Sequence, residues 1–353
     1  MKKNTRTKFE NTSKPTRGPS IKTEQKNFLD LILRTDKLED KVWQGTPPAL
    51  REEKISPPLI LKSTANKDYA LIDSGNGLKL ERFGPYTIIR PEGQALWAPH
   101  LDLEAWRTAD ALFTGNTEEE GLGRWDFLKK PLAATWPMRW RHLSFLGRFT
   151  SFRHVGYFPE QEAHWLFMQN IIKTRLKQQE KVEVLNLFGY TGLASLIAAD
   201  AGAHVTHIDA SKKAIGWARE NQEIAHLQDK PIRWICEDAV KFVLREVRRQ
   251  KKYDIILLDP PAFGRGPQGE VWRLFEDLPN LLQHCCTLLS VHSSCLILTA
   301  YTIRASFYAL DNLMWDHFKH LPGCIESGEL LIQEEVGHRV LSTSLFSRWT
   351  NKI

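Results

Sequence analysis

Short apolar runs alternate with longer amphipathic segments through the second half of the chain, which predicts a repeating strand–helix order. Five runs predict strands: Val182–Leu187, His204–Ile208, Ile232–Ile235, Tyr253–Leu258 and Ser294–Ala300. Helices are expected around them at Glu162–Lys177, Leu193–Ala201, Lys212–Ala225, Val240–Gln250, Leu274–Leu289 and Ile303–His320. Gly328–Glu334 and Arg339–Phe346 then predict a terminal hairpin. We expect a mostly parallel seven-stranded sheet whose last strand is antiparallel.

A different pattern of short strand-like runs and turns precedes this region, and it predicts a small, mainly antiparallel β domain over residues 66–149. Asn76-Gly77 separates two strand-like runs, which is a strong hairpin signal. Five of the twelve tryptophans fall here, at positions 97, 106, 125, 136 and 140. Tryptophans in such a domain usually form its core. Arginines lie among them, so stacking on RNA bases is the alternative.

Residues 1–65 are expected to hold a basic disordered tail, a short helix at Phe28–Leu38 and a proline-rich linker at Gln44–Pro58. Residues 1–27 contain eight Lys or Arg and two Glu, so they account for the whole net charge of +6. The tail is interpreted either as an electrostatic arm for RNA phosphates or as a solvated extension. Residues 150–353 are expected to form the catalytic domain.

Several classes of protein are disfavoured by composition. No run approaches eighteen apolar residues, so we expect no membrane span. The five cysteines are odd in number and show no zinc-ligand spacing, which favours reduced thiols in a cytoplasmic protein. His154, His164, His204 and His207 show no metal-ligand spacing either, so we expect ordinary core or surface histidines and no metal site.

Polar residues follow the predicted strands where ligands of open α/β sheets bind. The first strand runs into Phe188-Gly189-Tyr190-Thr191-Gly192 and then a helix, whose start presents unpaired main-chain N–H groups. Asp209 ends the second strand, where an acid can accept hydrogen bonds from both ribose hydroxyls; the alternative is an N-cap of the next helix. Asp238 follows the third strand, and the fourth runs into Asp259-Pro260-Pro261-Ala262-Phe263.

Four motifs in this order resemble the class I S-adenosylmethionine-dependent methyltransferases. Asn186-Leu187-Phe188-Gly189-Tyr190-Thr191-Gly192 and Asp259-Pro260-Pro261-Ala262-Phe263 are most similar to motifs of bacterial large-subunit rRNA methyltransferases. The likeness covers roughly Asp68 to Trp349. It implies a Rossmann-like α/β fold, S-adenosylmethionine as cofactor and RNA, above all ribosomal RNA, as partner.

The resemblance also implies which residues contact the cofactor. Asp209 would take the ribose hydroxyls, and Asp238 would accept from the adenine amine beside Ala239. Asn186 replaces the acid commonest in class I enzymes, and its amide can still hold the cofactor's ammonium. The full expected set is Asn186, Phe188, Gly189, Tyr190, Gly192, Asp209, Ala210, Asp238 and Ala239.

The acceptor site is expected at Asp259, Pro260, Pro261 and Phe263. Asp259 can accept a hydrogen bond from a base, and Phe263 can stack on a base extruded from its helix. Ala262 stands where DNA amino methyltransferases carry their aromatic residue, which argues against an exocyclic amine as acceptor. Phe158 and Gln161 belong to a segment that, in the resembled group, lies over the cofactor, and we expect both to contact the substrate. Arg265, in a glycine-rich loop expected to be mobile, would meet a phosphate or remain solvated.

No cysteine follows the fourth or fifth strand, so we expect in-line methyl transfer to an RNA base without a covalent cysteine intermediate. A small-molecule or protein acceptor remains an alternative, as does a non-catalytic RNA-binding module. A nicotinamide-dependent oxidoreductase is disfavoured because Gly-x-Gly-x-x-Gly is absent.

Overall fold

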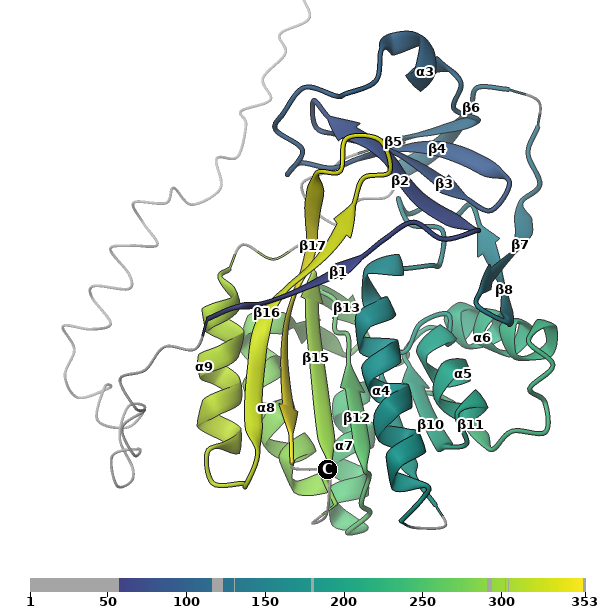
Figure 1. Cartoon of the computed structure of the whole chain (residues 1–353). Helices are drawn as coiled ribbons and strands as arrows, with labels where there is room; N and C mark the ends of the chain where they lie inside the picture. The colour runs from purple at the N-terminus through teal and green to yellow at the C-terminus, as the bar shows by residue number, and fades with distance from the viewer. Residues whose placement is uncertain are drawn as a thin grey trace, which may run out of the picture. The chain divides into compact units, whose positions relative to one another are not determined.

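Eight strands form the central sheet of the computed structural model (Figure 1). From one edge to the other they are β1 (Leu59–Ser63), β16 (Cys324–Gln333), β17 (Val340–Thr350), β15 (Cys295–Tyr301), β12 (Ile255–Leu258), β9 (Glu183–Leu187), β10 (His204–Asp209) and β11 (Ile232–Cys236). Strand β17 is antiparallel to β15 and β16, and the other neighbours in this sheet pair in parallel. The expected antiparallel last strand is therefore confirmed.

The structure describes residues 57–115, 123–129, 131–178, 181–290, 294–301, 303 and 305–351. The expected basic tail, the helix at Phe28–Leu38 and most of the proline-rich linker lie outside these residues. From Pro57 onward the chain forms one compact unit.

The eighth strand corrects the expected count of seven. Leu59–Ser63 was placed in the segment 1–65, where no strand was expected, but as β1 it pairs in parallel with Gly328–Ile332 of β16. Gly328 permits the close approach, because a Cβ there would lie 1.9 Å from the Leu59 carbonyl oxygen. The run is short and directly follows Pro57-Pro58, which indicated a linker; proline is nevertheless tolerated at the start of an edge strand.

Helices flank the sheet at the expected places (Figure 1). They are α4 (Glu162–Arg175), α5 (Leu193–Asp200), α6 (Lys212–Ile224), α7 (Ala239–Arg248), α8 (Leu274–Leu288) and α9 (Phe307–Phe318). Alternate strand residues face two hydrophobic clusters. One joins Val184 and Val205 to α4 and α5, and the other joins Leu185 and Ile256 to α7, α8 and α9. None of the described helices is long and apolar enough to cross a membrane.

The expected β domain consists of a five-stranded sheet, a hairpin and a short helix. The sheet holds β2 (Tyr69–Gly75), β3 (Leu78–Phe83), β4 (Tyr86–Pro91), β5 (Ala111–Gly115) and β6 (Gly123–Phe127); the hairpin is β7 (Thr135–Trp140) and β8 (Leu143–Arg148), and the helix is α3 (Leu103–Arg107). Pairing is antiparallel except between β4 and β5. Asn76 and Gly77 have φ of 52° and 76°, as a type I′ hairpin turn requires.

The tryptophans of this domain serve its core. Trp106, Trp136 and Trp140 are buried, while Trp97 and Trp125 are partly buried against the same cluster that reaches α4 and α5. The Trp140 indole donates to Glu162 Oε1 across 3.0 Å, which ties β7 to the start of α4. The β domain and the central sheet therefore share one hydrophobic core.

Candidate functional site

The turn after β9 has an unusual backbone. Phe188 and Tyr190 have φ of 57° and 48°, a left-handed conformation that non-glycine residues rarely adopt. Gly189 donates its amide to the Ile208 carbonyl at 3.0 Å, and Tyr190 donates its amide to Asp209 Oδ2 at 2.9 Å. Such strain is typical of functional sites held by surrounding contacts.

The glycines of this turn are required by the protein's own packing. A Cβ on Gly189 would lie 2.3 Å from His207 Cε1, and one on Gly192 would lie 2.8 Å from Ala218 Cβ. Gly192 also begins α5 with φ of 81°. Glycine is therefore required at both positions by packing within the protein.

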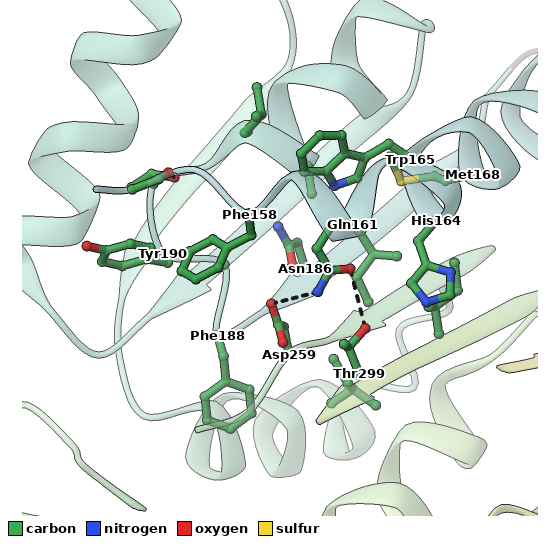
Figure 2. A pocket seen from close by; sticks show the side chains of 18 residues that line it. Phe158, Gln161, His164, Trp165, Met168, Asn186, Phe188, Tyr190, Asp259 and Thr299 are labelled. Carbon is green, nitrogen blue, oxygen red and sulfur yellow. Dashed lines mark hydrogen bonds between the residues drawn. The ribbon is translucent and has the colours of Figure 1, made fainter. Parts of the chain in front are cut away.

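Two adjoining cavities lie at the carboxyl ends of the parallel strands. The larger has a volume of ≈ 600 Å³ and is lined by these expected site residues: Phe158, Phe188, Tyr190, Asp209, Ala210, Asp238, Ala239, Asp259, Pro261 and Arg265. The smaller, ≈ 80 Å³, is shown in Figure 2 and adds Gln161, Asn186 and Gly189. Gly192, Pro260 and Phe263 are not among the residues that line either cavity. The strand order reverses between β9 and β12, so this is the position where open α/β sheets bind ligands.

Asp209 and Asp238 are held by main-chain amides. Asp209 accepts from Tyr190 through Oδ2 and from the Ser211 amide through Oδ1 at 2.8 Å. Burial raises the pKa of the Asp209 carboxyl, against the opposing effect of these two amides. Asp209 does not cap α6, because Ser211 is the N-cap. Asp238 does cap α7, accepting from the Lys241 amide at 2.9 Å.

Gln161 connects the chain before α4 to two strand ends. It closes the 3₁₀ turn η1 (Pro159–Gln161), and its Nε2 donates to Asp259 Oδ2 across 3.2 Å. Its Oε1 accepts from Thr299 Oγ1 at 3.4 Å, as the dashed lines in Figure 2 show. Gln161, expected to face the substrate, therefore positions Asp259 as well.

The segment after Asp259 forms an ordered hairpin of β13 (Phe263–Arg265) and β14 (Val271–Arg273), where a mobile loop was expected. Trp272 points inward, packs on Phe188 with ring centroids 4.9 Å apart, and donates to the Pro261 carbonyl at 2.8 Å. The Pro261 carbonyl is therefore engaged by the protein's own indole.

Phe263 lies on the outer face of this hairpin. Its side chain is 49% exposed, and the Arg265 guanidinium carbon lies 6.0 Å from its ring centroid. The pair is therefore accessible to a large ligand at the mouth of the site.

An aromatic wall of the larger cavity was missed from the sequence. His154 stacks on Phe152 and packs against Phe158, each with centroids 5.5 Å apart, and Phe158 lies 6.4 Å from Tyr301. Burial, reinforced by Arg90 and Arg153, lowers the pKa of His154 to about 3, so its ring is neutral. His154 was interpreted as an ordinary core or surface histidine; its flanking aromatic residues were the available signal.

Asn186 directs its amide nitrogen into the protein. Nδ2 donates to Ser195 Oγ at 2.9 Å, and that hydroxyl contacts His207 Nδ1 at 2.9 Å. The side-chain oxygen of Asn186 is therefore the atom suited to accept a hydrogen bond from a ligand in the smaller cavity.

None of the five cysteines, all of which are in described residues, lines either cavity. Burial raises the pKa of Cys295, inside β15, to about 12. Across the described ranges, no three His, Cys, Asp or Glu side chains gather as metal ligands.

A sheet with this strand order, an antiparallel β17 and acids after β10 and β11 defines a class I methyltransferase. Residues 166–283 match the family described as Conserved hypothetical protein 95. The crystal structure of the SAM-dependent methyltransferase from Agrobacterium tumefaciens is 56% identical and covers 84% of this chain and 94% of that one, with a TM-score of 0.79. The chain therefore belongs to the S-adenosylmethionine-dependent methyltransferases. This membership contradicts the oxidoreductase interpretation and favours an enzyme over a non-catalytic module.

A curated relative matches a shorter part of the chain. Ribosomal RNA large subunit methyltransferase K/L of Shewanella baltica is 37% identical over 129 residues, which cover 35% of this chain. The match spans 18% of that relative's own length.

Proposed function

We propose that this enzyme methylates a base of RNA, with ribosomal RNA as the acceptor. One observation carries the proposal: a single cavity joins the strand-end acids to an aromatic wall and to Asp259. The name of the Shewanella baltica relative supports ribosomal RNA as the acceptor. An RNA acceptor and five free thiols both favour a cytoplasmic location.

The cavity residues fit S-adenosylmethionine. Asp209 is oriented by two amides and retains lone pairs for the ribose hydroxyls, and Asp238, beside Ala239, is placed for the adenine amine. Phe188, Tyr190 and Ala210 would enclose the nucleoside. The smaller cavity suits the methionine part, where the Asn186 oxygen would accept from the ammonium and Gly189 would lie alongside.

The aromatic wall favours a flat acceptor. Phe158, His154 and Tyr301 present ring surfaces to the larger cavity. Because the His154 ring is neutral, it can act as a third aromatic surface without adding a positive charge. Flipped bases are commonly held by such stacking. At the mouth, Phe263 would stack on a neighbouring nucleotide, and Arg265 would meet a phosphate.

The residues of the site act mainly by positioning. When bound, S-adenosylmethionine would supply an electrophilic methyl group to a nucleophile of the acceptor, with S-adenosylhomocysteine as the leaving group. Gln161 holds Asp259 so that its carboxylate can accept a hydrogen bond from the acceptor base. The buried Pro260 and the Trp272–Pro261 hydrogen bond make the turn rigid, which favours near-attack geometry. An already nucleophilic ring nitrogen needs no cysteine to activate it.

Labelled methyl transfer tests this proposal. The protein is incubated with radiolabelled S-adenosylmethionine and separated RNA, protein and small-molecule pools from a strain that lacks its gene. We expect label in large-subunit ribosomal RNA, at one nucleoside after digestion, and an initial rate about ten- to hundredfold lower with Asp209→Ala at limiting cofactor. Label confined to the protein or small-molecule pool would contradict the proposal.

A further inference from the structure

One part of the lining of the larger cavity is strongly charged. Lys79 and Glu81 of β3, Arg90 of β4, Glu92 just beyond it and Glu160 of η1 all line the cavity. Two of these residues are basic and three are acidic; Arg153 also lines the cavity, but it is not among the groups that act electrostatically on Glu160.

Both bases are already paired with other acids. Arg90 Nε contacts Glu81 Oε2 at 2.7 Å, and Arg90 Nη2 contacts Glu81 Oε1 at 2.8 Å. Lys79 Nζ lies 3.2 Å from Glu92 Oε2. These two pairs account for Glu81 and Glu92, which leaves Glu160 as the acid of this group outside both ion pairs.

Glu160 forms no ion pair with any residue in the described part of the chain, and no other side chain there donates to its carboxyl. The basic groups that act on it electrostatically are Lys79 and Arg90. Burial raises the pKa of Glu160 above its usual value. An acid placed in this way costs stability unless a ligand supplies hydrogen-bond donors, and such groups cluster at functional sites.

Glu160 also belongs to the segment that reaches the transfer site. The next residue, Gln161, donates to Asp259, and Phe158, two residues earlier, belongs to the aromatic wall. A flat acceptor stacked on that wall would have its edge within the same cavity as the Glu160 carboxyl.

We propose that Glu160 positions the acceptor base by accepting hydrogen bonds from its N–H groups. This inference rests on the proposed RNA function and assigns a residue that contacts the acceptor rather than the cofactor. Within the described residues only its own main-chain amide donates to the Glu160 carboxyl, so acceptor oxygens remain for the N–H groups of a bound base.

The test uses Glu160→Gln in the full chain, because the amide keeps the shape and removes the acceptor charge. Wild type and variant are assayed with unmethylated large-subunit ribosomal RNA made by transcription. We expect kcat/KM for this RNA to fall about ten- to hundredfold, mainly through KM. Cofactor affinity by calorimetry should stay within about twofold, and Tm should be equal or higher because an unpaired buried charge is removed. Glu104→Gln is the matched control, since that side chain is 75% exposed on α3.

The outcomes separate the inference from the function on which it rests. An unchanged KM for RNA in Glu160→Gln, beside an active wild type, would overturn the inference alone. A parallel loss of cofactor affinity or a lower Tm would assign Glu160 to the cofactor site or the fold, and would also overturn it. A wild type that methylates no RNA would contradict the proposed function itself, and the inference with it.

Discussion

Gln161 donates a hydrogen bond to the Asp259 carboxylate across 3.2 Å, although 97 residues separate them in the chain. The bond joins the end of η1, before the first helix of the catalytic region, to the turn after β12. Because Gln161 also accepts a hydrogen bond from Thr299 within β15, one side chain connects the turn after β12 to β15. The orientation of Asp259 therefore depends on a residue outside the acceptor motif.

Removing this connection should impair turnover more than stability. In Gln161→Ala, Asp259 loses one donor, and a single hydrogen bond of this kind is worth about 0.5–1.5 kcal/mol, so kcat/KM should fall about three- to tenfold. Steady-state kinetics with labelled cofactor and RNA measure the effect. Gln178→Ala, at an exposed position after α4, is the control and should leave kinetics unchanged. Equal kinetics for both variants would mean that Gln161 does not position Asp259.

The exposed ring of Phe263 should contribute to RNA binding and not to cofactor binding. Stacking of one base on an aromatic ring is worth about 1–3 kcal/mol, so Phe263→Ala should weaken RNA affinity at least about fivefold. Phe263→Tyr should restore most of the loss, because the ring remains. Filter binding measures RNA affinity and calorimetry measures cofactor affinity. Weaker cofactor binding in Phe263→Ala would place the ring in the cofactor site instead.

Methyl transfer should proceed without a covalent enzyme–RNA intermediate. Cys295 is buried within β15, and its raised pKa, about 12, keeps the thiol protonated. RNA containing 5-fluorocytosine should therefore fail to trap the enzyme on a denaturing gel, and Cys295→Ser should retain activity. A stable cross-link that disappears in Cys295→Ser would show that this thiol reaches the base.

Acid should destabilise the fold through its buried histidines. Burial is the main cause that lowers the pKa of His154, His164 and His207 to about 3. The native state then binds fewer protons than the unfolded state, whose histidines titrate near 6.5. Stability should fall as the pH drops from about 6.5 toward 3, by up to about 1.4 kcal/mol per pH unit for each histidine.

His164 offers a direct check, because neither ring nitrogen has a hydrogen-bond partner. Urea unfolding of His164→Phe at pH 5 and pH 7 should show a smaller loss of stability between the two values than the wild type. His226→Gln, at an exposed position, should keep the wild-type difference. A difference in His164→Phe equal to that of the wild type would mean that His164 is protonated in the folded protein.

The periodic parts of the structure were predictable, and the parts that depend on tertiary contacts were not. Runs such as Tyr253–Leu258 are long enough to show strand character, so the parallel order and the antiparallel last strand follow from the sequence. Strand β1 directly follows two prolines, which indicated a linker, and β13 has only three residues, too few to show a period. They form because β16 and β14 supply partners.

In the candidate site, too, some residues were predictable from local sequence and others were not. Asp209 and Asp238 were found because acids after parallel strands must meet at one edge of the sheet. The roles of Trp272 and Gln161 depend on hydrogen bonds to Pro261 and Asp259, which no local pattern encodes. Glycine at position 189 is required by His207, which is adjacent only in the folded chain.

Calorimetric titration of the cofactor tests the central claim, that the strand-end acids form the S-adenosylmethionine site. Wild type, Asp209→Ala and the control Asp229→Ala, at an exposed turn, are titrated with S-adenosylmethionine. Losing a charged acceptor costs about 1.5–3 kcal/mol, so Asp209→Ala should bind about ten- to hundredfold more weakly, while Asp229→Ala matches the wild type. Wild-type affinity in a folded Asp209→Ala protein would contradict the assignment of this cavity to the cofactor.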